Sequence, residues 1–166
     1  EAMQAVRLIK EDGRLTAATS SQITDGASGV MVVNERGLKA LGVAPLARIH
    51  HMSVLGADPV IMLEAPIPAT ERALKRAGMK IGDIDLYEVN EAFASVPLAW
   101  LQSLGADPEK LNVNGGAIAL GHPLGGSGTK LMSTLVNALG KRGGRYGLQT
   151  MCEGGGLANV TFVERL

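Results

Sequence analysis

Aromatic residues, cysteine and net charge are all scarce in this sequence. Only 3% of the residues are aromatic, so any core must be built mainly from aliphatic side chains. The single cysteine excludes an internal disulfide and fits a reducing compartment, which predicts a cytoplasmic protein. Basic and acidic residues balance at 16 each without a basic cluster, and no apolar run could span a bilayer. We therefore expect neither a nucleic-acid nor a membrane partner.

Glycine and aliphatic residues are abundant instead. The 22 glycines are too many for a plain helical bundle and predict many tight turns. A hydrophobic content of 46% argues against disorder, and 166 residues suffice for one domain with a real core. The sequence begins at Glu1 within a helical pattern and without an initiator methionine, as a fragment would.

Strand and helix patterns alternate along the chain and predict an α/β domain with a mixed sheet. We expect strands over residues 30–33, 46–55, 84–89, 147–152 and 157–164, the last two as an antiparallel pair. We expect helices over residues 35–41, 69–77 after Pro68, 90–104 and 127–139. In the third helix Asn90 is the expected N-cap and Pro97 should cause a kink. Gly140 is expected to end the fourth.

One histidine lies inside a glycine-dense loop. Residues 114–128 read NGGAIALGHPLGGSG, and His122 is the only titratable side chain among them. A rigid loop that aims one imidazole suits acid–base or oxyanion chemistry. The alternative is a glycine-rich connection with a structural histidine.

The only cysteine, Cys152, ends an apolar run and directly precedes three glycines. A lone cysteine in an apolar strand is usually a small buried hydrophobe. Here the glycines would expose the sulfur and offer free backbone N–H groups, which can bind a developing oxyanion. A thiol beside an imidazole can also lose its proton near neutral pH.

Other site types find no support. Lys130 in GGSGTK does not follow the glycine spacing of a phosphate-binding loop. His50 and His51 have no cysteine or carboxylate at ligand spacing, so we expect no metal site. No G-x-S-x-G nucleophile motif is present.

Three motifs in order, NEAF at residues 90–93, GHPLGGSG at 121–128 and CEGGG at 152–156, resemble the C-terminal half of the thiolases. The resemblance extends over essentially the whole chain, from LTAATSSQITDGAS onward. It implies a thiolase-like C-terminal domain over residues 25–166, with a mixed, mostly five-stranded sheet and helices on both faces. Residues 1–24 would then be the tail end of a preceding loop region and its lead-in.

The resemblance also assigns roles in acyl transfer between coenzyme A thioesters. Cys152 matches the family's acid/base, not its acylated nucleophile, and the Gly154 N–H matches an oxyanion donor for the acyl-enzyme. His122 matches the histidine that polarises the thioester oxygen and helps to activate the nucleophile. Asn90 matches the asparagine that holds a water as second donor, although an N-cap asparagine needs no catalytic role.

The substrate contacts implied by the resemblance are less specific than the catalytic motifs, because each position could equally be ordinary packing. The positions along the pantetheine arm are Ala17 and Ser21, and those at the thioester and acyl end are Met62, Ala92 and Phe93. The chain departs from the family pattern at residues 19–22 and 63–65, so the acyl-chain length is not predicted.

The family's acylated cysteine lies in an N-terminal half, and no second cysteine is present here. We therefore expect this chain to be inactive alone. Its expected partners are acyl-CoA, coenzyme A and that N-terminal half, without any metal or redox cofactor, in a homodimer or homotetramer. An isolated half should also expose an apolar face. The alternatives are a non-catalytic acyl-CoA- or lipid-binding module, a self-sufficient cysteine acyltransferase or hydrolase and, less favoured, a decarboxylating condensing enzyme of the ketoacyl-synthase type.

Overall fold

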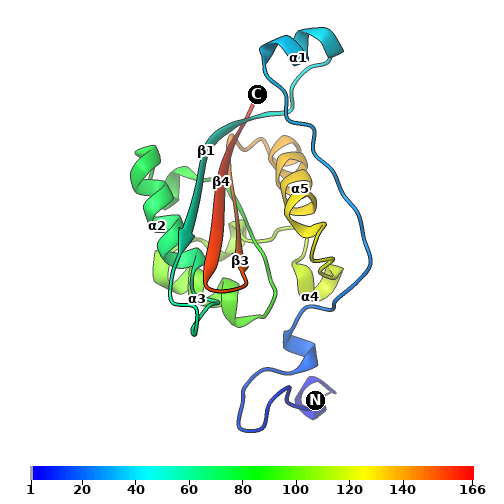
Figure 1. The fold of residues 1–166 in the computed structure, drawn as a ribbon, viewed down its shortest axis with the longest axis vertical. Helices are drawn as coiled ribbons and strands as arrows, with labels where there is room; N and C mark the ends of the chain where they lie inside the picture. The colour runs from blue at the N-terminus through cyan, green and yellow to red at the C-terminus, as the bar shows by residue number, and fades with distance from the viewer. Residues whose placement is uncertain (1) are drawn as a thin grey trace.

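A four-stranded mixed sheet organises the fold (Figure 1). The computed structural model describes residues 2–166. The strands follow the order β1-β4-β3-β2 and are β1 (Ala47–Gly56), β2 (Leu86–Val89), β3 (Tyr146–Glu153) and β4 (Leu157–Arg165). Strand β4 is antiparallel to both of its neighbours, whereas β2 and β3 are parallel. The predicted α/β class with a mixed sheet is confirmed.

Helices cover both faces of the sheet, as expected. The α-helices are α1 (Glu35–Leu41), α2 (Pro66–Ala77), α3 (Ser95–Leu104), α4 (Ala117–Leu120) and α5 (Ser127–Arg142). Short 3-10 turns occupy Ala2–Ala5, Ala17–Thr19, Ile81–Asp83 and Pro108–Lys110. Helices α2 and α3 lie on one face and α5 on the other (Figure 1). The larger core cluster, on the α2–α3 side, contains Tyr87, Trp100 and Phe162, and the smaller one joins Leu86 to Leu135 and Leu139.

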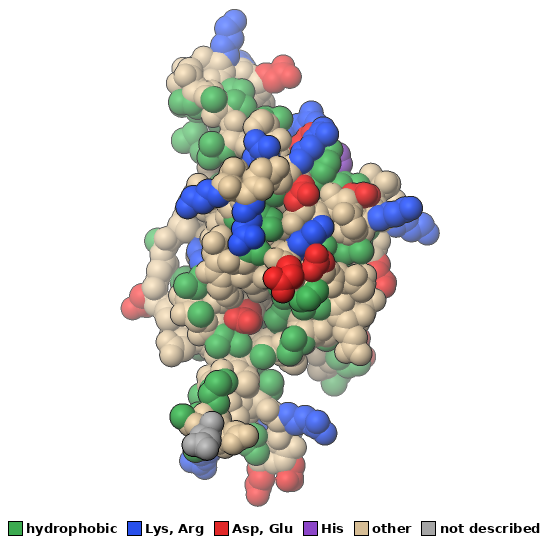
Figure 2. Space-filling model, turned by 180° about the vertical axis from the view of Figure 1, so that it is seen from behind, with side chains coloured by type: hydrophobic (Ala, Val, Ile, Leu, Met, Phe, Trp, Pro, Cys, Tyr) green, Lys and Arg blue, Asp and Glu red, His purple; other side chains and the backbone are tan. Residues whose placement is uncertain are grey.

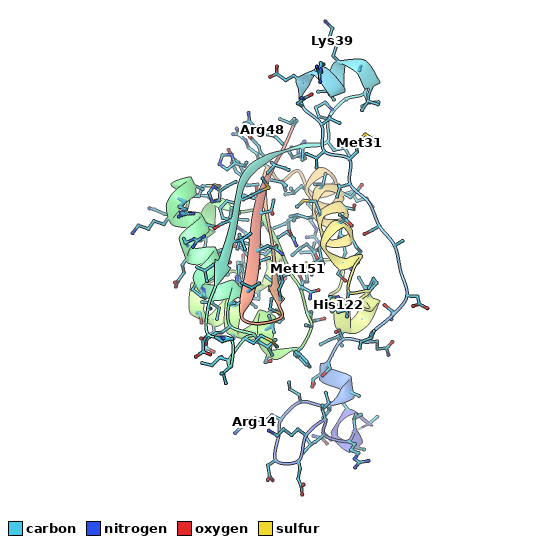
Figure 3. The ribbon with its side chains drawn as sticks, viewed as in Figure 1. Arg14, Met31, Lys39, Arg48, His122 and Met151 are labelled. Atoms are coloured by element: carbon cyan, nitrogen blue, oxygen red, sulfur yellow. The ribbon has the colours of Figure 1, made fainter. Side chains whose placement is uncertain are left out.

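The expected fifth strand is wrong. Residues 30–33 form no strand, and Met31 and Val32 are 75% and 72% exposed. This segment runs along the outside of the molecule between the α5 side and α1 (Figures 1 and 3). A β-branched run favours a strand only where a neighbouring strand supplies hydrogen bonds and packing. At the β2 edge, the one extension of the sheet among residues 2–166 is a parallel bridge between Tyr87 and Leu111.

The predicted start of the third helix is also wrong. Helix α3 begins at Ser95, so Asn90 is not its N-cap but lies in the loop that follows β2. Pro97 consequently falls in the first turn of α3. An N–H in the first turn has no intrahelical acceptor, so proline is tolerated there without the expected kink.

Two further helix boundaries differ from the predictions. Helix α5 continues past Gly140 to Arg142, and Gly143 then takes the left-handed conformation. Gly140 is exposed, and the tertiary packing of α5 outweighs its poor helix propensity. Helix α2 begins at Pro66, slightly earlier than predicted.

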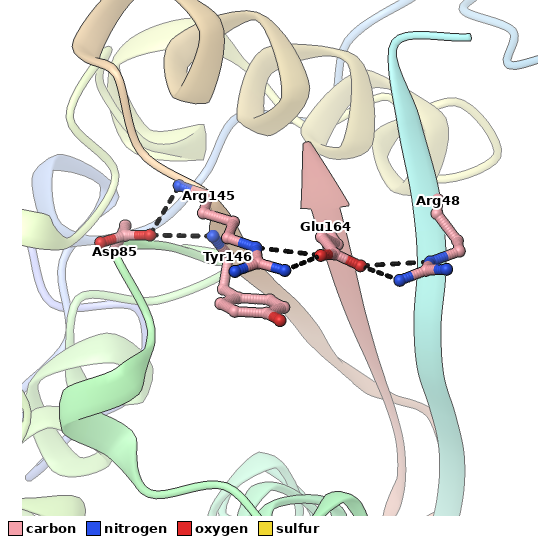
Figure 4. Close-up of polar contacts among 5 residues, drawn as sticks. All are labelled: Arg48, Asp85, Arg145, Tyr146 and Glu164. Carbon is pink, nitrogen blue, oxygen red and sulfur yellow. Dashed lines mark hydrogen bonds and ion pairs between the residues drawn. The ribbon is translucent and has the colours of Figure 1, made fainter. Parts of the chain in front are cut away.

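An ionic cluster closes the end of the sheet where β3 begins (Figure 4). The nearly buried Glu164 carboxylate accepts hydrogen bonds from the guanidinium groups of Arg48 and Arg145. Hydrogen bonding from Arg145 and then Arg48 holds the pKa of Glu164 below its ordinary value. Asp85 accepts from the backbone N–H groups of Arg145 and Tyr146 at 2.7 and 2.8 Å.

Candidate active site

The predicted site residues lie at the opposite end of the sheet. Parallel strands β2 and β3 end at the same edge, so the loop that follows β2 and the turn that follows β3 lie there together. The loop that contains His122 joins them just before α5, and Figure 3 shows His122 beside α4 and the N-terminal end of α5. Three motifs separated by some thirty residues each along the sequence are thus brought to one edge.

Asn90, His122 and Ser127 form a buried hydrogen-bonded chain. Asn90 Nδ2 lies 3.2 Å from His122 Nε2, and His122 Nδ1 lies 2.6 Å from Ser127 Oγ. The three residues are 1%, 8% and 2% exposed. The Ser127 hydroxyl donates to the Pro123 carbonyl at 2.9 Å, so it can only accept from the imidazole. This assigns the proton of the neutral imidazole to Nδ1 and leaves a lone pair on Nε2, which accepts from Asn90.

The environment keeps His122 neutral. Burial lowers the pKa of His122 below its ordinary value, and the nearby Lys130 ammonium lowers it further. A neutral imidazole that carries its lone pair on Nε2 is a base that can take a proton from a thiol.

Asn112 and Glu91, which no sequence pattern indicated as site residues, stabilise this edge of the sheet. The Asn112 side chain bonds both backbone groups of Val89, accepting from its N–H at 3.0 Å and donating to its carbonyl at 2.9 Å. Glu91 Oε2 accepts from the Ile118 N–H at 3.0 Å, which fastens the loop after β2 to α4. These contacts join residues that lie 23 and 27 positions apart in the sequence, so no local pattern predicted them.

Cys152 lies near the end of β3 and is half-buried. It packs against the larger core cluster, as does Phe93. Burial, and to a smaller extent the charge of Glu153, raises the pKa of Cys152 above its ordinary value, while a backbone hydrogen bond lowers it. Among residues 2–166 no hydrogen bond joins this thiol to His122. The expected activation of the thiol by an adjacent imidazole is therefore not found, and Cys152 is protonated at neutral pH.

The turn after Cys152 leaves Gly154 unobstructed, whereas Gly156 is fixed by contacts with the residues after β1. A side chain at Gly154 would meet no heavy atom within 4 Å, and its N–H donates to no backbone oxygen in the described chain. Gly156 has φ +78° and allows the carbonyl oxygens of Ala57 and Asp58 to approach closely. The Ala57 N–H donates to the Gly156 carbonyl at 2.8 Å. The turn therefore holds its position while the Gly154 N–H stays free.

The segment that precedes residue 24 forms backbone hydrogen bonds with two loops, the one that follows β2 and the one that contains His122. The Ser21 N–H donates to the Ala92 carbonyl and the Ala94 N–H to the Thr19 carbonyl, both at 2.9 Å. The His122 N–H donates to the Gln22 carbonyl, also at 2.9 Å. Ser21, Ala92 and neighbouring Phe93 are thereby brought together.

The remaining two predicted substrate residues lie outside that group. Ala17 is exposed in the 3-10 turn just before the bridging segment. Met62 lies in the turn after β1, with φ +56°. Beside His122, an open depression of about 320 Å³ is lined by residues 24–28 and 123–126.

Residues 2–166 contain neither a metal-binding cluster nor a membrane-spanning helix. No group of three or more His, Cys, Asp or Glu side chains is arranged to hold a metal ion within that range. None of the helices described there combines the length and apolar character needed to cross a membrane.

Comparison with known sequences gives one family. Residues 43–165 match the family model described as "Thiolase, C-terminal domain". The chain is 60% identical over 166 residues to the steroid 3-ketoacyl-CoA thiolase FadA6 of Mycobacterium tuberculosis. It is 52% identical over 159 residues to a 3-ketoacyl-CoA thiolase of Marinobacter nauticus. The alignments cover 100% and 94% of this chain, but the chain spans only 41% of each relative.

Solved structures agree with these sequence matches. The acetyl-CoA acetyltransferase of Bacillus anthracis superposes with a TM-score of 0.95 at 38% identity. Human mitochondrial 3-ketoacyl-CoA thiolase in complex with CoA superposes with a TM-score of 0.90 at 44% identity. Each alignment covers 99% of this chain and 42% of the other.

Proposed function

Because the chain belongs to the thiolase family and matches its C-terminal domain, we propose that it supplies the acid–base groups of an acyl-CoA thiolase site. The observation that carries the proposal is the buried chain from Asn90 through His122 to Ser127, with distances of 3.2 and 2.6 Å. The substrates are coenzyme A thioesters. Residues 25–166 form the catalytic domain, and residues 1–24 lead into it.

His122 acts first as a base and then as a hydrogen-bond donor. Its Nε2 lone pair takes the proton of the nucleophilic cysteine, whose thiolate attacks the keto carbon of a 3-ketoacyl-CoA. The resulting Nε2–H then donates to the thioester oxygen, which becomes an enolate oxygen when the carbon–carbon bond breaks. Asn90 provides the second donor, through a water. Loss of one such donor typically slows catalysis about 10²- to 10³-fold.

Cys152 moves the second proton. In thiolysis its thiol donates a proton to the α-carbon of the departing acetyl-CoA, and the thiolate so formed takes the proton of incoming coenzyme A. In condensation the steps run in reverse: the thiol gives its proton to the departing coenzyme A thiolate, and the Cys152 thiolate so formed takes the α-proton of acetyl-CoA. The raised pKa of Cys152 supports this role, because the thiol carries its proton at neutral pH.

The remaining predicted residues bind the substrate. The free N–H of Gly154 holds the oxygen of the acyl-enzyme. Ser21 and Ala17 flank the pantetheine arm, and Ala92, Phe93 and Met62 line the thioester and acyl end. The bridging hydrogen bonds of Ser21 support this placement, because they bring the segment against the loop that contains Asn90. No metal or redox cofactor takes part in these steps, because the thioester itself acidifies the α-carbon.

The nucleophilic cysteine comes from an N-terminal thiolase half, so this chain alone does not turn over. Cys152 is the only cysteine in the sequence, and its proposed role is that of the acid/base. Acyl transfer by this route needs a nucleophile and a separate base.

Acetoacetyl-CoA thiolysis tests the proposal. The loss of substrate absorbance is followed for the chain alone, and for the chain mixed with or fused to the N-terminal part of the 60%-identical Mycobacterium relative. We expect activity only in the mixture or the fusion, reduced at least 10²-fold by Cys152→Ala or His122→Ala.

Two results would overturn the proposal. Turnover by the chain alone that Cys152→Ala abolishes would make Cys152 the nucleophile of a self-sufficient enzyme. A folded fusion that binds acyl-CoA without turnover would favour a non-catalytic binding module.

A further inference from the structure

Glu88 is a buried carboxyl that the steps above do not use. It lies on β2, is 1% exposed, and its Oε2 atom has no hydrogen-bond partner among residues 2–166. Leu86, two residues earlier, packs with Leu135 and Leu139 of α5, so the alternation of β2 directs Glu88 toward α5 as well. The same alternation, continued by the hydrogen bond from the Asn90 N–H to the Thr150 carbonyl, brings Asn90 to that side.

Asn90 has an unpaired atom of its own. Because Ser127 fixes the proton of His122 on Nδ1, Asn90 must present its Nδ2 to Nε2. Its Oδ1 therefore points away from the imidazole, and this oxygen is buried without a partner in the described chain. A buried amide oxygen strongly favours a donor, because leaving it unpaired costs its full desolvation.

We propose that Glu88, in its protonated form, is the donor to Asn90 Oδ1, directly or through one bridging water, and so orients the amide on His122. Two residues along a strand span about 6.6 Å, which the two side chains can close between them. Glu88 is then a positioning residue for the oxyanion site, acting through Asn90. The effect on catalysis rests on the proposed function, but the orientation of the amide does not.

The charges around Glu88 favour this state. Burial raises the pKa of Glu88 to about 7, and the Lys130 ammonium of α5 opposes that rise. Gln149, which pairs with Glu88 in register on β3, is buried and neutral. The same Lys130 lowers the pKa of His122, so its field reaches both groups. Below neutral pH the carboxyl thus holds the proton that the amide oxygen needs.

Nuclear magnetic resonance on the 166-residue chain tests the orientation without any turnover. We expect the Glu88 carboxyl carbon and the Asn90 side-chain NH₂ signals to shift together with one midpoint near pH 7, separate from the lower midpoint of His122. Glu88→Gln keeps a neutral donor, so the Asn90 signals should lose the pH-dependent shift with its midpoint near pH 7. Asn90 signals that ignore the titration of Glu88 would overturn the proposal.

The catalytic consequence is tested in the complemented enzyme with two variants of similar size. Glu88→Gln should keep kcat within twofold of the parent, whereas Glu88→Met, which has no donor, should lower kcat about tenfold with KM changed less than twofold. Equal rates for both variants would overturn the positioning role. Failure of complementation itself would refute the proposed function and leave the spectroscopic result standing.

Discussion

Ser127 sets the chemistry of the site at the scale of a single residue. Its hydroxyl is bound to the Pro123 carbonyl and can only accept from His122, which fixes the proton of the imidazole on Nδ1. The base at Nε2 is therefore prepared by a buried residue. This arrangement reconciles the two proposed roles of His122, because the proton it removes from a thiol becomes the donor at Nε2.

Ser127→Ala should lower kcat of the complemented enzyme about 10- to 100-fold, since the imidazole loses the acceptor that fixes its tautomer. Steady-state thiolysis measures the rate, and ¹⁵N shifts of the His122 ring measure the tautomer. Ser133→Ala on the same helix, where the hydroxyl only bonds a backbone carbonyl, should stay within twofold of the parent. A rate for Ser127→Ala that matches this control would contradict the prediction.

Glu88 also predicts how stability depends on pH. Its folded-state pKa is raised from 4.5 to about 7, so the folded protein binds the proton more tightly than the unfolded chain. The contribution is fully present below pH 4.5 and is lost as the pH rises toward 7, which amounts to about 3 kcal/mol. Urea unfolding at several pH values should show this decline for the parent chain. A decline that persists in Glu88→Gln would assign it to another group.

At the scale of elements, the edge of the sheet that holds Asn90 depends on how β2 ends. This strand has only four residues, and the Asn112 side chain bonds both backbone groups of its last residue. The Asn112 side chain thus takes the place of one residue of a neighbouring strand. It keeps the backbone extended from β2 to Asn90.

Asn112→Ala should reduce the free energy of unfolding by about 1–3 kcal/mol, because a partly buried N–H and carbonyl lose their partners. Chemical denaturation measures the loss. Asn137→Ala, at an exposed position of α5, should change stability by less than about 0.5 kcal/mol. If the two variants unfold alike, the support that we assign to Asn112 is wrong.

The sequence predicted most helices and strands well, but it predicted poorly the tertiary contacts around them. The alternating strand and helix patterns predicted the α/β class and the four strands of the sheet, and the three motifs predicted His122 and Asn90, which do meet. The strand predicted over Val30 to Val33 was wrong because a β-branched run reports propensity and not the presence of a pairing strand. Asn90 was expected to cap a helix, since asparagine before a helical pattern is a common N-cap. The unpaired oxygen of Glu88 and the tautomer of His122 depend on contacts between distant segments, which no local pattern records.

At the scale of the whole molecule, apolar surface remains uncovered. Figure 2 shows charges of both signs spread over the rear of the molecule with apolar side chains exposed between them. The extended residues 30–33 add four exposed apolar side chains on a segment without a strand partner. Such a segment can pair with another chain through its backbone and side chains alike.

We expect the chain to self-associate at tens of micromolar concentration. Sedimentation velocity should show a mass that rises with concentration, and replacing Met31 and Val32 by lysine should shift the protein toward monomer. Leu98→Lys, at an exposed apolar position of α3, should not have this effect. A parent chain that stays monomeric at every concentration would contradict the prediction.

The ionic cluster of Glu164 with Arg48 and Arg145 has an evolutionary consequence. It lies about 20 Å from the edge that holds His122 and Cys152, since β3 runs eight residues from one end to the other. Substitutions so far apart contribute nearly independently. Adaptation to growth temperature or salinity can therefore change these surface arginines, which are 63% and 65% exposed, without disturbing the proposed acid–base groups. Lineages from different habitats should vary more at one end of the sheet than at the other.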